Sequence, residues 1–122
     1  MSDGVKLIAA ERDRQISEEG WTAEHDDEHV DGSMALAAAC YAAPQPLFLQ
    51  DRRYVNRVVY EDAWPWEGKW DKRFSYGTCR DNPGNVLPDP DSYSAEERVD
   101  LLVKAGALIA AELDRLLRAR NR

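Results

Sequence analysis

The chain has 122 residues, of which 23 are acidic and 16 basic, and its formal net charge is −7. This length favours one domain, and a hydrophobic content of 43% excludes global disorder. The negative charge argues against nonspecific binding of duplex nucleic acid, because neutralising phosphates needs a basic face. No uncharged stretch is long enough to span a bilayer, and the first residues lack the basic and apolar regions of a signal peptide. We therefore expect a cytoplasmic protein with no membrane partner and with two free thiols.

Two helices are predicted in the first third of the chain. The first runs from about 5 to 18 and ends before Gly20. The second is predicted as one helix from about 22 to 43, with Thr22 as its N-cap and Pro44 preventing its continuation. The second half of this helix is rich in alanine. Small side chains allow a neighbouring helix to approach closely, so we expect this helix at the centre of the packing.

The third predicted helix covers about 95–119. Ser94 and Glu97 form a capping box at its start. Apolar residues then repeat at helical spacing, among them Val99, Leu102, Ile109, Leu113 and Leu116. The stripe is broad, which predicts that the helix is largely buried or lies in a subunit interface.

The segment 44–93 has a different character. It contains all six prolines and three of the four tryptophans. Leu47–Leu49 and Tyr54–Tyr60 are predicted to be short helical turns or strands, and the rest is predicted to be loop. We therefore predict a single all-α domain over 1–122. It is a helical bundle with a long irregular middle segment, and we expect oligomerisation to complete it, since three helices are not expected to close a core alone.

An acidic segment at 18–31 is the most unusual feature of the sequence. Seven of its fourteen residues are acidic, and no lysine or arginine occurs from Gln15 to Asp51. On a continuous helix, Glu24, Glu28 and Asp31 share one face. Carboxylate oxygens are the ligands that Mg²⁺ prefers, so a metal site is one interpretation. The other is a solvated helix start, because acids suit the positive end of the helix dipole.

The two histidines of the chain lie one helical turn apart. His25, Glu28 and His29 match the pattern H-x-x-E-H of inverted zinc proteases, although a third ligand such as Glu112 would be needed. The plainer interpretation is that the imidazoles form hydrogen bonds to neighbouring carboxylates and orient them.

Aromatic and basic residues supply the remaining candidates. Trp64 and Trp66 either anchor a loop on the helices or form a stacking platform for a base, and Trp21 could do the same beside the acids. Lys104 lies within the apolar run of the third helix, where a lysine either extends its amine to solvent or meets a buried acid or a phosphate.

Five segments together resemble a family of small phage and prophage proteins. They are Glu11–Gln15, Glu19–His29, Ala37–Ala42, Trp64–Trp66 and Leu102–Glu112. Members of this family are commonly grouped with the MazG-like, all-α nucleoside triphosphate pyrophosphohydrolases, which include phage enzymes acting on dATP and dGTP. The resemblance implies a helical bundle, a homo-oligomer (dimer or tetramer), Mg²⁺ dependence and cleavage to a monophosphate and pyrophosphate. The wider group carries E-E-x-x-E on one helix and E-x-x-D on the next. Glu28–Asp31 fits the second motif, whereas Glu18–Glu19 fits only the first two positions of the other.

On this basis we hypothesise a Mg²⁺-dependent pyrophosphohydrolase of a (deoxy)nucleoside triphosphate, with Mn²⁺ as a possible substitute metal. The metal ligands would be Glu19, Asp27, Glu28 and Asp31. The groups that move the proton would be Glu28, His25 and His29. Lys104 and Arg53 would bind phosphate, and Trp21, Trp64 and Trp66 would bind the base. One alternative is a non-catalytic phage protein that binds or sequesters a nucleotide. Another is an interaction protein whose acidic face docks a basic partner.

Overall fold

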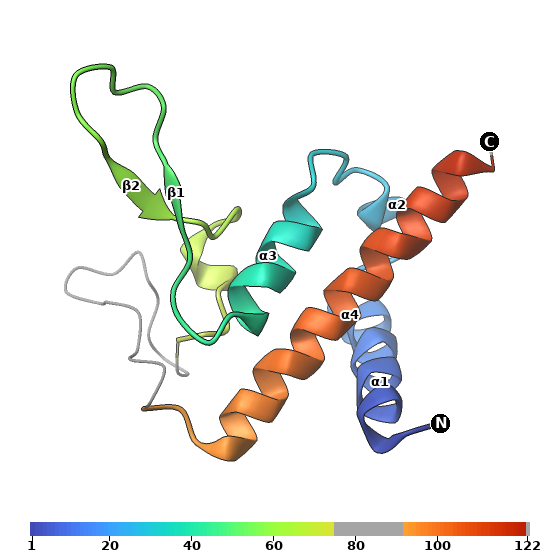
Figure 1. Ribbon diagram of the computed structural model, residues 1–122. Coiled ribbons are helices and arrows are strands. Elements are labelled where there is room, and N and C mark those ends of the chain that lie inside the picture. The colour runs from blue at the N-terminus through green and yellow to red at the C-terminus, as the bar shows by residue number, and fades with distance from the viewer. Residues whose placement is uncertain (75–91, 122) are drawn as a thin grey trace.

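The computed structural model describes residues 1–74 and 92–121, and most of them are helical (Figure 1). The helices are α1 (Asp3–Glu18), α2 (Ala23–Asp26), α3 (Ser33–Ala42) and α4 (Ala95–Arg120), with a 3₁₀ turn η1 (Gly68–Trp70). Two short strands, β1 (Phe48–Gln50) and β2 (Tyr60–Asp62), complete the elements. The mostly helical fold is therefore confirmed. The predicted loop over 75–91 lies outside the described residues. Among those described, no helix is long and apolar enough to cross a membrane.

Both long helices begin where their capping residues predict. At the start of α1 the Ser2 hydroxyl accepts a hydrogen bond from the Val5 amide at 3.3 Å. At the start of α4 the capping box is present: Ser94 Oγ accepts from the Glu97 amide at 3.0 Å, and the Glu97 carboxylate accepts from the Ser94 amide at 3.1 Å. These contacts satisfy amides that have no partner within a helix, which explains why both helices start there.

The prediction of one continuous helix from 22 to 43 is wrong. Thr22 is an N-cap as expected, but α2 ends at Asp26 and α3 begins only at Ser33. The break has a local cause at Gly32, whose φ of +81° lies in the left-handed region that glycine adopts without strain. The Asp31 carboxylate also accepts a hydrogen bond from the Ser33 amide at 3.0 Å. This competing local contact favours a turn over helix continuation.

The core forms where α3 packs against α4. Ala37 and Ala38 of α3 and Ala105 and Leu108 of α4 are buried in one cluster. The alanines allow the close approach that the sequence predicts. On another side of α4, Ile8 of α1 packs over Gly106, where an added Cβ would lie 2.5 Å from the Ile8 side chain.

The middle segment contains a β-hairpin that projects away from the helices (Figure 1). Its strands are antiparallel, with Phe48 opposite Asp62 and Gln50 opposite Tyr60. The expectation of short strands is thus met near Leu47–Leu49, whereas most of Tyr54–Tyr60 connects the two strands.

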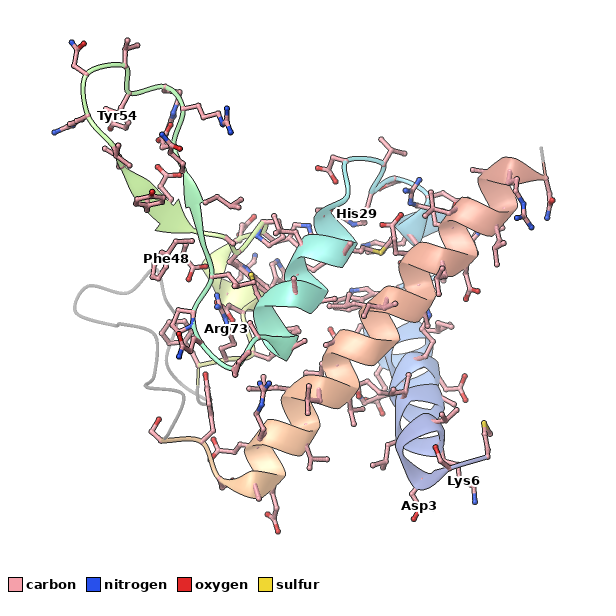
Figure 2. The ribbon with its side chains drawn as sticks, in the orientation of Figure 1. Asp3, Lys6, His29, Phe48, Tyr54 and Arg73 are labelled. Atoms are coloured by element: carbon pink, nitrogen blue, oxygen red, sulfur yellow. The ribbon has the colours of Figure 1, made fainter. Side chains whose placement is uncertain are left out.

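After the hairpin, the chain returns to the core through Tyr41 of α3. The Tyr41 hydroxyl donates to the Trp70 carbonyl at 3.2 Å and accepts from the Lys72 amide at 3.1 Å. Burial raises the pKa of this hydroxyl. Arg73, which Figure 2 shows beside α3, is buried and forms ion pairs with Asp71 at 2.7 Å and Asp62 at 3.0 Å. These contacts fix the segment that carries the tryptophans against the helices.

Replacing Gly32 by alanine should destabilise the fold by about 1–2 kcal/mol, because a residue with a Cβ is strained at positive φ. The space around Gly32 is open, so the effect isolates the backbone conformation. The matched control is Gly4→Ala within α1, which also has open space and should be neutral or stabilising. Urea unfolding measures both. Equal midpoints for the two variants would contradict the account of the α2–α3 break.

Candidate functional site

A cavity of about 400 Å³ opens between the end of α1, the α2–α3 segment, the tryptophan segment and α4. We call it the aromatic pocket. Its lining residues are Glu19, Trp21, His25, Asp26, His29, Met34, Trp66, Glu67, Trp70 and Leu108. The volume lies within the range of about 300–1,000 Å³ that is typical of small-molecule sites. The lining combines flat rings with a few polar groups, which is also typical of such sites.

One wall of the pocket is a continuous row of rings. Trp21 and His25 are parallel, with an interplanar angle of 3° and 6.1 Å between centroids. His25 meets His29 edge to face at 5.0 Å, and His29 contacts Trp66 at 5.4 Å. Behind Trp66, the buried Trp64 packs perpendicular to it at 5.7 Å. Each ring therefore restricts the orientation of the next, and the row joins the α2–α3 segment to the tryptophan segment.

A buried ion pair between α1 and α2 supports the row of rings. Asp26 is only 1% exposed, and its Oδ2 lies 2.5 Å from Arg12 Nη2. Arg12 also donates to the Trp21 carbonyl at 3.4 Å. One guanidinium thus holds α2 and the chain segment before it against α1. The position of Trp21 and His25 follows from this contact.

Each histidine has one ring nitrogen next to a polar partner. His25 Nδ1 lies 3.4 Å from Asp26 Oδ1, and His29 Nδ1 lies 3.4 Å from Ser33 Oγ. Figure 2 shows His29 at the N-terminal end of α3. Among the described residues, no hydrogen bond involves either Nε2 atom. Such an arrangement orients an imidazole and leaves its second nitrogen for a ligand.

Negative side chains line the pocket, and positive side chains lie in the adjoining cavity behind its aromatic wall. The lining holds three carboxylates, those of Glu19, Asp26 and Glu67, and its described residues include no lysine or arginine. A smaller adjoining cavity shares the wall formed by Glu19 and adds Arg14 and Lys104. The Arg14 guanidinium lies 3.1 Å from the Glu19 carboxylate. The cations therefore lie behind the aromatic wall rather than in the pocket itself.

Lys104 meets a buried acid, which is one of the two outcomes that its position predicts. Its Nζ lies 3.7 Å from Glu11 Oε1, and both side chains are at least 85% buried, being 15% and 10% exposed. Burial opposes the charged form of Glu11, but hydrogen bonding from Arg14 and the charge of Lys104 outweigh it and lower the pKa of Glu11. Arg14 in turn has a raised pKa, chiefly because of its hydrogen bond to Glu11.

The four carboxylates hypothesised as metal ligands do not converge. Only Glu19 lines the aromatic pocket. Asp27 accepts from Arg118 at 2.8 Å, Glu28 is exposed, and Asp31 is exposed and bonded to Ser33, which lowers the pKa of Asp31. Within residues 1–74 and 92–121, no group of three or more His, Cys, Asp or Glu side chains is placed to hold a metal ion. Within the described part of one chain, these four carboxylates are therefore not brought together.

The two histidines of the H-x-x-E-H pattern remain neighbours, with 5.0 Å between their ring centroids. Glu28, however, follows the end of α2, is exposed and does not line the pocket with them. Glu112, the third zinc ligand considered, is bonded to Arg115. No zinc site is formed by these groups in the described part of the chain.

Of the hypothesised base-binding residues, the structure brings Trp21 and Trp66 into the pocket and leaves Trp64 behind them. Trp64 is buried and donates from Nε1 to the Glu67 carbonyl at 3.1 Å. This is the loop-anchoring role that the sequence also allows. Arg53, hypothesised to bind phosphate, is bound to Asp51 on the hairpin and does not line the pocket.

Sequence reasoning missed half of the pocket lining. The missed residues are Asp26, Met34, Glu67, Trp70 and Leu108. A signal existed for Trp70, which belongs to the same tryptophan-dense segment as Trp66. Leu108 has no local signal, because it lies more than eighty residues further along the chain than the α1–α2 connection and reaches the pocket only through folding.

A scan against models of protein families and searches of curated proteins and of solved structures each found no match to this chain. The resemblance to the MazG-like group therefore stays a hypothesis.

Replacing Asp26 by alanine should cost about 3–5 kcal/mol of stability, because Arg12 would keep a buried charge without its partner. The control is the double variant Arg12→Met/Asp26→Leu, which removes both charges and should cost much less. Chemical unfolding of Arg12→Met, Asp26→Leu and the double variant gives the coupling energy. A loss below about 1 kcal/mol for Asp26→Ala would show that this pair does not hold α2 in place.

Proposed function

We propose that this protein binds a (deoxy)nucleotide and holds the base in the aromatic pocket. The observation that carries the proposal is the wall formed by Trp21, Trp66 and Trp70 with the two imidazoles around a cavity of about 400 Å³. Stacking of a base on an aromatic side chain contributes about 1–3 kcal/mol and needs no basic surface. An acidic protein can therefore bind a nucleotide at such a site.

The carboxylates of the lining favour particular bases. A carboxylate accepts a hydrogen bond from an exocyclic amine, as in cytosine, and has no donor for a carbonyl oxygen. Glu19 and Glu67 are the candidates for this contact, since Asp26 is already bound to Arg12. The same charges repel phosphates, so the phosphate chain would extend away from the lining acids. Bases that carry an amine should bind more tightly than thymine or uracil.

A second candidate is hydrolysis of the bound nucleoside triphosphate to the monophosphate and pyrophosphate. The observation that favours it is His25 beside the buried Asp26 in the pocket wall. An imidazole oriented by a carboxylate is suited to accept a proton from an attacking water. The water oxygen would bond to the α-phosphorus, and pyrophosphate would leave. This alternative needs the α-phosphate beside His25, which is a different pose from the one in which the base occupies the aromatic pocket.

Binding is tested by calorimetry with dCTP and dTTP. At the position where cytosine carries an exocyclic amine that can donate to a carboxylate, thymine carries a carbonyl oxygen that cannot. dCTP should bind more tightly. Trp70→Ala should weaken dCTP binding about 5- to 150-fold, which corresponds to the loss of one stacking contact. Trp70 is 42% exposed, so its loss should leave the fold intact. The control is Tyr60→Ala, an exposed aromatic on β2 outside the pocket. Equal effects of the two variants would contradict the assigned pocket.

Hydrolysis is tested by measuring release of pyrophosphate and monophosphate from each common NTP and dNTP, with Mg²⁺ and with chelator. His25→Asn should lower the rate about 100-fold or more if the imidazole takes the proton. Glu28→Gln, on an exposed residue outside the pocket, should leave the rate within about twofold. If Glu28→Gln abolishes turnover in a folded protein, the assignment to His25 is wrong and the acidic-motif hypothesis is favoured. Tight binding with no product would leave a nucleotide-binding protein without this activity.

A further inference from the structure

The lining of the aromatic pocket combines two kinds of group that attract positive charge. It contains three indole rings and three carboxylates, and among the described residues no lysine or arginine belongs to it. The face of an indole ring carries negative charge density and attracts a cation within about 6 Å of its centroid. A neutral base uses only the stacking surface of these rings. A base that carries a positive charge also gains from their faces and from the carboxylates.

One cation of the protein already makes these contacts beside the pocket. Lys69 Nζ lies over the Trp70 ring, 5.2 Å from its centroid, and 3.4 Å from the Glu67 carboxylate. The two residues that it contacts line the pocket, whereas Lys69 does not. The side chains of Lys69 and Glu67 are 62% and 71% exposed, so a ligand can displace this amine at little cost. Trp70 and Glu67 are therefore placed to bind one cationic ligand together.

Glu67 is the lining acid whose charge is least neutralised by the described protein. Asp26 pairs with Arg12 at 2.5 Å, and both side chains are largely buried. Glu19 pairs with Arg14 at 3.1 Å, and these side chains are also more than half buried. Glu67 instead meets an exposed lysine, and solvent screens such a contact strongly. Of the three lining acids, Glu67 is thus the most available to a ligand.

Cytosine becomes a cation when a methyl group is attached to its ring nitrogen N3. The charge is shared between N3 and the exocyclic amine, which is the group that donates a hydrogen bond to a carboxylate. A hydrogen bond between charged partners is roughly twice as strong as one between neutral groups. The flat ring also brings the charge to the indole faces. One added methyl group at N3 therefore strengthens both interactions of the pocket with the base.

We propose that the aromatic pocket selects nucleotides whose base is positively charged through alkylation of a ring nitrogen. Trp70 stacks on the charged ring, and Glu67 accepts a hydrogen bond from its amine. This inference rests on the proposed function, because it requires that the pocket holds the base. It adds the class of base: among bases that carry an amine, the alkylated and cationic ones bind most tightly.

Calorimetry at neutral pH with dCMP, 3-methyl-dCMP and 5-methyl-dCMP tests this preference. Monophosphates cannot release pyrophosphate, so binding is measured without turnover. Both methylated bases carry one methyl group and keep the exocyclic amine, but only the 3-methyl base is charged. 3-methyl-dCMP should therefore bind about 5- to 30-fold more tightly than 5-methyl-dCMP.

The outcomes separate this inference from the proposal on which it rests. Equal binding of the two methylated nucleotides, or tighter binding of 5-methyl-dCMP, would overturn the preference for a charged base and leave nucleotide binding intact. Binding of none of the three nucleotides would contradict both.

The contribution of Glu67 is measured with Glu67→Gln. The glutamine oxygen still accepts from the amine, so 5-methyl-dCMP should bind within about twofold of wild type, whereas the preference for 3-methyl-dCMP should fall about fivefold. The matched control is Glu61→Gln, which removes the same charge from an exposed residue of β2 outside the pocket and should keep the preference. An equal fall in both variants would show an effect of net charge alone and overturn the assignment to Glu67.

The competing amine is removed by Lys69→Met. Because Trp70 and Glu67 then lack their cation, the preference for 3-methyl-dCMP should rise about two- to fivefold. Lys6→Met, which removes an exposed lysine of α1, is the control and should leave the preference unchanged. The same preference in Lys69→Met as in wild type would contradict the shared contact of Trp70 and Glu67.

Discussion

The buried ion pair between Arg12 and Asp26 determines how the N-terminal third of this protein is arranged. A carboxylate that is 1% exposed needs a charged partner, and the partner comes from the helix before it. Because the same guanidinium also bonds to the Trp21 carbonyl, a single side chain places α2, the segment before it and the first ring of the pocket wall. Most other contacts of the aromatic pocket, including the row of rings from Trp21 to Trp66, follow from that placement.

The pair also explains why an acidic segment without local cations is stable in this fold. The sequence shows seven acids between 18 and 31 and no lysine or arginine from Gln15 to Asp51, which is consistent with a metal or another positive group from outside that segment. In the structure, the distant groups are arginines of α1 and α4: Arg12 pairs with Asp26, Arg14 with Glu19, and Arg118 with Asp27. Arg14 also pairs with Glu18, so protein cations meet four of the seven acids. The other three, Glu24, Glu28 and Asp31, are exposed.

Local signals predicted the fold well and the site only in part. The cap at Thr22, the stop before Pro44 and the capping box at Ser94 each depend on a few neighbouring residues, and all three are present. The break at Gly32 was missed because a glycine inside a helical pattern is tolerated at a modest cost, and only the turn conformation reveals that this one has positive φ. The predicted placement of acidic side chains on one helix face assumed a continuous helix, so the break at Gly32 removes its basis. Trp21, His25, His29 and Trp66 were predicted as candidates because of residue type, whereas Met34 and Leu108 join the pocket through tertiary packing that no local pattern encodes.

Saturation-transfer NMR distinguishes a pocket that holds the base from a pocket that holds the phosphates. Protein protons are saturated in the presence of excess dCTP, and the transfer to each nucleotide proton is measured. If the base lies between the rings of the aromatic pocket, the base protons should receive the strongest saturation and shift upfield, and the H5′ protons next to the phosphates should receive the least. Stronger transfer to the H5′ protons, or equal transfer to all protons that persists in Trp70→Ala, would contradict the account.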